Sequence, residues 1–445
     1  MVVDRVGVSE VEAAALTIDG EYGQAINGLA FQQDALVSHR GWQYLAYYDA
    51  ARRVCLARRR LPDGAWQILR FGDYDFTSND AHNTISLGIS ARDGTIHLAF
   101  DHHGDPLHYR VSRPGVASDP EGVEWEPSLF GPVTSELEEG RPISITYPRF
   151  VPTPDGGLQF CYRQGGSGDG DRMLVDYDPG RGIWTGTRMI DSGAGWFEDE
   201  GGVSDSRCSY PNGYDYGPRG RLHVTLVWRE SSQGSNHDLV YVYSEDGGRT
   251  WLNDRGEPLS GPPRVDSPGI TVVEIGMGLG LMNTHGQAVD SKGRIHTVMW
   301  HCTEASLAAA GSAPGRERWG AAGARRYHHY WRDVDGEWHH RELPGPSGSR
   351  PKLFIDAADN AVLIYGSQRG PASDLEIAVA TAAADWTDWR IAHTEPGPFV
   401  NEMLGDRIRW AEEGILSVMV QDTPPEPHQP TRLQVIDLTV RVPQD

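Results

Sequence analysis

Two histidine groups lie near the start of the chain, and histidine is the side chain that changes charge most readily near neutral pH. The first contains His82, and the second is the pair His102 and His103. Segments 84–89 and 95–100 between them read as strands joined by an Asp-Gly turn, which predicts a β-hairpin. Because the ends of paired antiparallel strands are neighbours, we expect both groups at one sheet edge. Titratable groups gathered there predict a functional site, since burying them costs desolvation energy.

Three further segments place polar side chains at the ends of predicted strands. Tyr147 stands in the run Thr-Tyr-Pro-Arg-Phe. Arg163 ends a strand and precedes a Gly-rich loop, which leaves space above its guanidinium group. Tyr210 lies ahead of the strand that carries Arg229. These segments predict contributions to the same site from other parts of the chain.

A separate set of residues suits a metal ion. His285, Cys302 and the adjacent His328 and His329 fall within one stretch of the chain, and such ligands suit Zn²⁺. His301 and Cys302 point to opposite faces of an extended strand, so only one of them is expected to bind. The pattern predicts a structural zinc site made by His285, Cys302 and one of His328 or His329. The alternative is a buried cysteine beside surface histidines. Calcium is less favoured, because the chain lacks an EF-hand-like acidic loop.

The chain repeats itself loosely, at a period of about 60 residues. In each unit a strand, a loop and a second strand are followed by a turn that closes on a Trp or similar residue, and we expect each unit to form a blade of about four strands. The units are Trp42–Trp66, Thr95–Trp125, Gly157–Trp184, Arg221–Trp251, Arg294–Trp338, Asn360–Trp389 and Ile415–Val440. Seven such units predict an all-β fold, a single seven-bladed β-propeller over residues 1–445. Residues 1–20 are expected to form an N-terminal extension, with a short helix over Val11–Leu16 as one alternative.

One turn is nearly specific for this architecture. Residues 244–251 read Ser-Glu-Asp-Gly-Gly-Arg-Thr-Trp, which resembles the Asp box of sialidase-type propeller repeats. The aspartate is expected to cap backbone amides, and a glycine to adopt positive φ. This motif concerns folding and carries no chemistry. The arginine triad and Tyr-Glu pair of a retaining sialidase are not recognisable in the sequence.

Composition limits the classes of partner. The formal net charge of −22 argues against binding to nucleic acid or to an anionic membrane. Four widely spaced cysteines without a CxxC pair argue against a disulfide framework. The first residues lack the apolar stretch of a signal peptide, and no apolar run reaches the length of a membrane span. We expect a monomer, cytoplasmic as the sequence stands, or secreted if a leader has been removed.

The order of the motifs resembles that of the BNR-repeat propeller polysaccharide lyases, which include ulvan lyases and lyases that cleave rhamnosyl-glucuronate. The shared runs are Asp-x-His-Asn, Ile-His-Leu-Ala-Phe-Asp-His-His-Gly, Thr-Tyr-Pro-Arg-Phe and Tyr-Arg-x-Gly-x-Ser-Gly-x-Gly-Asp. The specific motifs cover roughly residues 20–300, and the last two units match only in their general pattern. The resemblance implies a catalytic group of His82, His102, Tyr147 and Arg163. It implies substrate-binding roles for Asn83, His103, Tyr210 and Arg229, and it leaves open which of His102 and His103 faces the substrate.

The residue types suit the β-elimination that this resemblance implies. A lyase removes the C5 proton of a uronate and expels the substituent on O4. Arg163 would neutralise the uronate carboxylate with two parallel hydrogen bonds, and His82 would donate another. We expect the cations to lower the pKa of Tyr147, so that it takes the C5 proton and then protonates the leaving oxygen. His102 would share either step, and the chemistry requires no cofactor.

Two other functions fit the same fold. A glycoside hydrolase needs two carboxylates beside the scissile bond, for which the candidates are Asp80, Asp101, Asp169 and Glu230. A non-catalytic carbohydrate-binding propeller would use the Trp and Tyr side chains as stacking platforms. The lyase hypothesis expects an acidic polysaccharide or oligosaccharide as the partner, bound through a local basic pocket.

Overall fold

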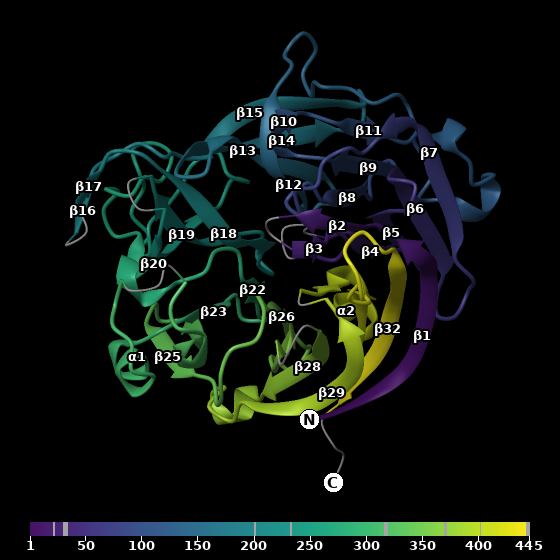
Figure 1. The fold of residues 1–445 in the computed structure, drawn as a ribbon. Helices are drawn as coiled ribbons and strands as arrows, with labels where there is room; N and C mark the ends of the chain where they lie inside the picture. Colours follow the sequence, from purple (N-terminus) through teal and green to yellow (C-terminus); the bar gives the residue numbers. More distant parts are fainter. Residues whose placement is uncertain are drawn as a thin grey trace.

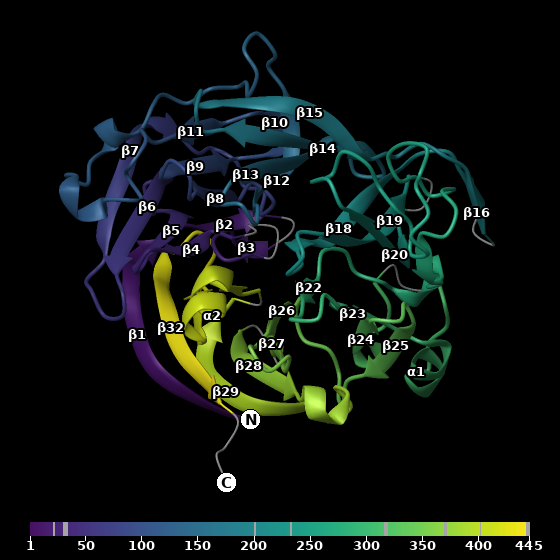
Figure 2. The same ribbon diagram turned by 180° about the vertical axis from the view of Figure 1, so that it is seen from behind.

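The structure is a computed structural model that describes residues 1–20, 23–29, 34–199, 202–231, 234–315, 319–368, 372–400 and 402–441. Strands dominate, and within these ranges they form seven antiparallel sheets and two small hairpins. The sheets stand around a central axis, as Figure 1 shows, so the all-β seven-bladed propeller is confirmed. Figure 2 shows the same ring from behind. In the described part of the chain, no helix is long and apolar enough to cross a membrane.

The innermost strand of each blade faces the central channel. These strands are β4 (Leu36–His39), β8 (Ile85–Ser90), β12 (Ser144–Pro152), β18 (Arg207–Tyr216), β22 (Gly286–Val289), β26 (Lys352–Ile355) and β30 (Leu404–Gly405). The second strands are β5 (Trp42–Tyr48), β9 (Thr95–Phe100), β13 (Leu158–Gly166), β19 (Leu222–Glu230), β23 (Ile295–His301), β27 (Ala361–Gly366) and β31 (Ile415–Gln421). Each second strand is antiparallel to its inner neighbour, so its end lies beside the start of that neighbour.

The outer strands complete the blades. The third strands are β6 (Arg53–Arg60), β11 (Tyr109–Val111), β14 (Asp169–Asp178), β20 (Asn236–Ser244), β24 (Arg326–Arg332), β28 (Ser373–Ala380) and β32 (Thr431–Arg441). The outermost strands are β7 (Gln67–Asp75), β15 (Ile183–Asp191), β21 (Thr271–Val273), β25 (Trp338–Glu342), β29 (Arg390–Phe399) and β1 (Val2–Ala15). Outside this pattern lie β10 (His103–Pro106), the hairpins β2 (Thr17–Gly20) with β3 (Gly23–Ala25) and β16 (Phe197–Asp199) with β17 (Gly202–Ser204), and the helices α1 (Glu304–Ala309) and α2 (Arg407–Glu413).

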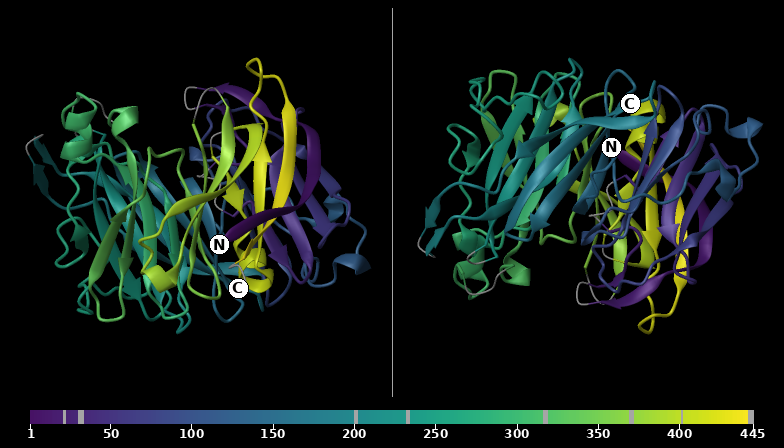
Figure 3. Two further views of the ribbon diagram at one scale, coloured as in Figure 1. Left: turned by 90° about the horizontal axis from the view of Figure 1, so that it is seen from below. Right: turned by 90° about the horizontal axis from the view of Figure 1, so that it is seen from above.

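The two ends of the chain close the ring. β1 pairs with β32 from Val2 opposite Arg441 to Ala15 opposite Thr431, and Figure 3 shows the purple β1 beside the yellow β32. The N-terminal residues therefore form the outermost strand of the last blade. The expected N-terminal extension is wrong for residues 2–15, and so is the helix considered over Val11–Leu16. Pairing with β32 satisfies the backbone groups of β1 and buries Val3 and Val11.

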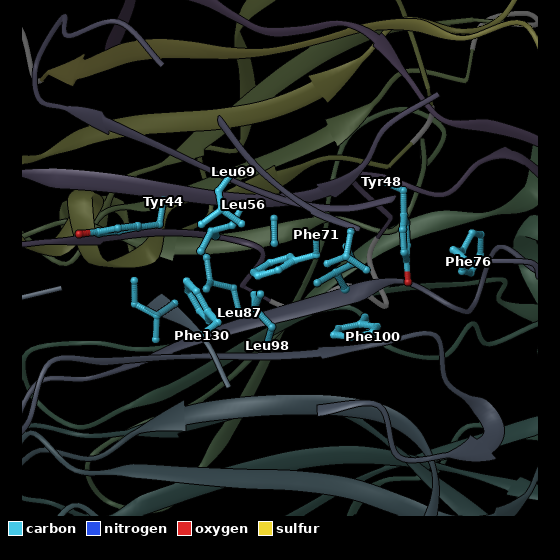
Figure 4. Close-up of a cluster of buried hydrophobic side chains, with 14 of the residues drawn as sticks. Tyr44, Tyr48, Leu56, Leu69, Phe71, Phe76, Leu87, Leu98, Phe100 and Phe130 are labelled. Carbon is cyan, nitrogen blue, oxygen red and sulfur yellow. The ribbon is translucent and has the colours of Figure 1, made fainter. Parts of the chain in front are cut away.

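Hydrophobic side chains fill the space between neighbouring blades. Figure 4 shows one such cluster, in which Tyr44, Leu56 and Phe71 of the first blade lie with Leu87 and Leu98 of the second. Dispersion contacts and removal of apolar surface from water stabilise this packing. The four cysteines are buried and form no disulfide, as the sequence predicts.

The Asp box adopts the predicted turn. Asp246 accepts hydrogen bonds from the backbone N–H groups of Arg249 and Thr250 at 3.0 and 2.9 Å, and from the Thr250 hydroxyl at 2.7 Å. Gly247 has φ of 71°, a conformation that favours glycine. Trp251 is buried in the cluster of hydrophobic side chains that this blade shares with its neighbour. The motif thus stabilises the turn and lies outside the chemistry, as expected.

Buried neutral histidines make the folded state sensitive to acid. Burial lowers the pKa of His97 and His223 to about 3 and that of His301 to about 4. The two ring nitrogens of His97 lie 2.7 Å from the hydroxyls of Tyr109 and Thr95. In the unfolded chain a histidine titrates near pH 6.5, so the unfolded state gains protons first as the pH falls.

We therefore expect the free energy of unfolding to decrease below pH 6.5, by about 1.4 kcal/mol per pH unit for each such histidine. The loss continues until the pH reaches the folded-state pKa values. Urea midpoints at several pH values between 7.5 and 4 measure it. The His97→Gln variant should show a shallower dependence, and an unchanged slope would contradict the role of this histidine.

Candidate active site

The predicted site residues come from strand ends that meet at one end of the central channel. His82 precedes β8, Tyr147 lies near the start of β12, and Tyr210 lies near the start of β18. Arg163 pairs in register with Thr146, and Arg229 pairs with Cys208. The fold therefore brings together side chains from three blades that are far apart in the sequence.

His82 and His103 form a stacked pair of imidazoles. Their ring centroids are 4.2 Å apart, with an angle of 21° between the planes. Asp80 contacts both rings, with Oδ1 2.5 Å from Nδ1 of His82 and Oδ2 2.6 Å from Nδ1 of His103. Burial by itself raises the pKa of Asp80, but the hydrogen bonds from His103 and His82 hold it well below its usual range. Burial lowers the pKa of His82, which Asp80 opposes, so the ring is neutral near pH 7.

His102 points away from this pair. It is 1% exposed, and its Nε2 accepts the backbone N–H of His108 at 2.8 Å. Burial lowers the pKa of His102 well below its ordinary value, with His108 as a second cause. Adjacent residues on extended backbone face opposite sides, so only one of the two histidines can reach the channel. His103 lies with His82 and Tyr147, whereas His102 contacts His108, and the catalytic role predicted for His102 stays a prediction.

Tyr147 stands at the centre of the site. Its ring centroid is 6.0 Å from that of His82, 6.1 Å from that of His103 and 5.9 Å from that of Tyr210. Its φ is 53°, and the register of β12 against β13 shifts between Thr146 and Arg149. Left-handed backbone is unfavourable for an aromatic residue, and such strain is typical of functional sites. The irregularity interrupts the regular pairing of the strand at Tyr147.

The electrostatics of Tyr147 differ from the expectation. Burial raises its pKa above the ordinary value, Tyr210 adds to this, and Arg163 and Arg350 only partly oppose it. The predicted lowering of the pKa is therefore wrong in direction. Desolvation of the phenolate outweighs the attraction of the cations, so Tyr147 is a neutral phenol near pH 7.

Two arginines surround the tyrosines. The guanidinium carbon of Arg163 lies 5.0 Å from the ring centroid of Tyr147 and 5.6 Å from that of Tyr210, and the residue is 1% exposed. Arg229 donates to the hydroxyl of Tyr210 at 3.1 Å and to Ser167 of the Gly-rich loop at 3.2 Å. These contacts concentrate positive charge at the site of an acidic protein, which favours an anionic ligand.

Asn83 supports the site through hydrogen bonds to two aspartates. Its amide nitrogen donates to Asp101 at 2.5 Å and to Asp105 at 3.1 Å, and the residue is 3% exposed. Asp105 in turn accepts the backbone N–H of His103 at 2.9 Å. Asn83 thus holds the turn that carries His103, and its predicted contact with substrate stays a prediction.

Sequence analysis missed Arg350 of the sixth blade. Arg350 donates to Glu402 at 2.6 Å and to Asn283 at 3.2 Å, and its charge lowers the pKa of both His82 and Tyr147. It therefore faces the catalytic candidates from across the channel. Arg350 lies just before the inner strand β26, as His82 lies just before β8. A polar residue at this position of a predicted blade is the sequence signal that could have identified Arg350.

Comparison with known proteins places this geometry in a family. A family model described as "BNR repeat-containing family member" matches residues 42–345, which is more than half of the chain. The chain belongs to this family. An ulvan lyase (long isoform) of an Alteromonas species is 26% identical to it in an alignment over 294 residues that covers 55% of this chain and 28% of that protein. The short isoform of Alteromonas sp. (strain LOR) is 24% identical in an alignment over 298 residues that covers 55% of this chain and 54% of that protein.

This BNR-repeat chain thus matches between about a quarter and about half of the length of these curated relatives. Solved structures resemble it over nearly its whole length. The polysaccharide lyase Uly1 has a TM-score of 0.76 at 17% identity, covering 99% of this chain and 100% of that one. A PL25 ulvan lyase bound to -[GlcA(1-4)Rha3S]- has a TM-score of 0.69 at 15% identity, covering 96% and 95%. At these identities the likeness shows the fold.

The predicted zinc ligands of this BNR-repeat propeller are not gathered at one point. Among the described residues, the group whose candidate ligand atoms all lie within 4.8 Å of one another is Asp80, His82 and His103. His285 accepts the backbone N–H of Trp300 at 3.1 Å, whereas Nδ1 of His328 lies 2.9 Å from Nε2 of His340. As placed, His285, Cys302 and His328 do not fit a zinc ion, and we assign no step to a metal there.

A cavity of the propeller lies at the other end of its channel. It has a volume of about 630 Å³ and is lined by the far ends of inner strands, including Ile89, Val151 and Tyr216, and by Trp410 of α2. It does not contain the paired histidines, Tyr147 or Arg163. The candidate site is therefore identified by its chemistry and by the convergence of strand ends, and it is separate from this cavity.

Proposed function

We propose that this protein is a polysaccharide lyase that cleaves the 4-O linkage to a glucuronate, in a rhamnosyl-glucuronate glycan, by β-elimination. The observation that carries the proposal is the position of Tyr147, between the buried guanidinium of Arg163 and the stacked imidazoles of His82 and His103. This arrangement supplies a cation, a proton donor and a proton acceptor within one small space.

The cation serves the first requirement of the reaction. The C5 proton of a uronate is weakly acidic, and its removal places negative charge on the adjacent carboxylate. Arg163 is always charged, is shaped for two parallel hydrogen bonds to a carboxylate and is shielded from water. A preorganised cation at the place where charge develops lowers the barrier most.

The proton donor and acceptor follow from the protonation states. Tyr147 is a neutral phenol because burial raises its pKa, so we assign to it the proton that goes to the leaving oxygen. His82 is neutral because burial lowers its pKa, so it or its stacked neighbour His103 takes the C5 proton. The C–O bond breaks as the C4–C5 double bond forms, and the enzyme regains its starting state when the imidazole returns the proton to Tyr147, directly or through water.

The substrate class rests on the relatives. Several are ulvan lyases, and one similar structure is bound to -[GlcA(1-4)Rha3S]-. The local cluster of Arg163, Arg229 and Arg350 gives this chain a means to bind an acidic glycan despite its net charge of −22.

The carboxylates near the site do not favour a glycoside hydrolase. Asp80 is bound to two imidazoles, and Asp101 accepts from Asn83 and from Tyr74. Glu230 is fully buried with Arg207, at 2.7 Å. A hydrolase would need one carboxylic acid and one carboxylate placed on either side of the scissile bond.

One assay tests the proposal. The protein is incubated with ulvan and with gum arabic, and the ultraviolet absorbance of the C4–C5 unsaturated uronate is followed over time. A rise in absorbance supports the lyase. Reducing ends that appear without this absorbance would show a hydrolase, and binding without either product would show a carbohydrate-binding propeller.

A further inference from the structure

We propose that Asp80 is a positioning residue that orients two imidazoles at once. One carboxylate oxygen accepts from Nδ1 of His82 and the other from Nδ1 of His103, at 2.5 and 2.6 Å. Both rings are thereby held as Nδ1–H tautomers with Nε2 unprotonated on the opposite edge. This inference rests on the proposed function, because it concerns which nitrogen the stacked pair presents to the substrate.

The surroundings fix Asp80 itself. Its Oδ1 also accepts the backbone N–H of His82 at 2.9 Å, and its own N–H donates to the hydroxyl of Ser78 at 3.0 Å. The side chains of Asp80 and His103 are each 28% exposed, and that of His82 is 11% exposed. The carboxylate is thus held by the backbone on one side while it holds two rings on the other. A carboxylate behind an imidazole is the usual means of fixing its tautomer.

The stacked arrangement explains why one carboxylate serves both rings. Two imidazolium ions 4.2 Å apart would repel each other, so a single negative charge suits a pair that carries at most one extra proton. Either Nε2 can then accept a proton while the other ring stays neutral. Asp80 therefore lets the pair act as one proton acceptor in front of Tyr147.

The distances favour shared protons over a bound metal ion. Two ligand atoms on one zinc ion, each about 2.1 Å from it, lie about 3 Å or more apart. The oxygen–nitrogen distances of 2.5 and 2.6 Å are too short for two ligand atoms on one zinc ion, and they fit direct hydrogen bonds between the carboxylate and the two rings. A metal held by Asp80, His82 and His103 is the competing explanation, and the experiment includes it.

The test combines spectroscopy with kinetics on the full chain. Long-range ¹H–¹⁵N correlation spectra of histidine-labelled protein report the tautomer of each ring, and His82→Gln and His103→Gln assign the signals. The wild type should show Nδ1–H for both rings. In Asp80→Asn at least one ring should change to Nε2–H, because the amide nitrogen donates where the carboxylate accepted. We expect kcat to fall about 100-fold with KM changed only a few-fold.

Two further variants keep the test decisive. Asp80→Glu retains a carboxylate and should restore the Nδ1–H tautomer of at least one ring and part of kcat, which also covers the case in which Asp80→Asn does not fold. Asp105→Asn is the matched control, since the hydrogen bond that Asp105 accepts from His103 comes from the backbone N–H of that residue. It should leave both tautomers unchanged.

Two outcomes would overturn the proposal. One is a folded Asp80→Asn that keeps both Nδ1–H tautomers. The other is loss of wild-type activity on chelation with recovery on adding Zn²⁺, which would make the three residues metal ligands. If the wild type forms no unsaturated product from either glycan, the lyase function fails, while the spectra still decide whether Asp80 sets the two tautomers.

Discussion

Tyr147→Phe is expected to lower kcat for formation of the unsaturated uronate about 1,000-fold, with a small change in KM. The phenol is the proposed donor of the proton to the leaving oxygen, and its ring lies 5.9 to 6.1 Å from those of Tyr210, His82 and His103. Phenylalanine keeps the aromatic ring and removes only that proton. Initial rates of absorbance change on ulvan, measured over a range of concentrations, separate kcat from KM.

The matched control is Tyr216→Phe. Tyr216 ends the same kind of inner strand at the opposite end of the channel, where its hydroxyl donates to Gln159 at 2.8 Å. This variant should keep the wild-type rate. A Tyr147→Phe protein that folds and retains more than a tenth of the wild-type kcat would exclude Tyr147 as the proton donor.

Arg163→Met should lower kcat about 100- to 1,000-fold, because it removes the cation proposed to neutralise the uronate carboxylate as charge develops. Arg163→Lys should recover only part of the rate, since an ammonium group lacks the planar pair of donors. The same absorbance assay measures both variants. Unsaturated product formed at the wild-type rate by Arg163→Met would contradict this role.

Folding must be checked for these arginine variants, because Arg163 is buried and its Nη1 lies 3.5 Å from Sγ of Cys208. Circular dichroism and thermal unfolding serve this purpose. Arg181→Lys is the control, at an exposed turn of the same blade. It should match the wild type in both rate and stability.

The ring of seven blades was predictable because its signals are local. Each signal depends on a few neighbouring residues: the alternation along a strand, a Gly-containing turn or the Asp box. Because the chain repeats, strand and turn signals recur in successive units and support one another. The exception was the first strand. Val2–Ala15 has little to mark its partner in the sequence, because β32 lies more than 400 residues away along the chain. Ring closure is a long-range pairing that local patterns do not report.

The site was predictable as a set of residue types and less so as a geometry. His82, Tyr147, Arg163 and Tyr210 do converge at one channel end, because inner strands of neighbouring blades start there. The sequence did not single out Arg350, because the sixth blade carries no recognised motif. The guanidinium group of Arg350 nevertheless lowers the pKa of Tyr147.

By itself, the sequence determined the repeat, the strand ends that carry chemistry and the residue types that β-elimination would need. Only the tertiary structure showed that His103 stacks on His82, that Asp80 joins these two rings, and that burial raises the pKa of Tyr147. The physical reason is that side-chain direction and pKa depend on backbone turns and on burial among other blades. Both are set by contacts between residues that the sequence keeps far apart.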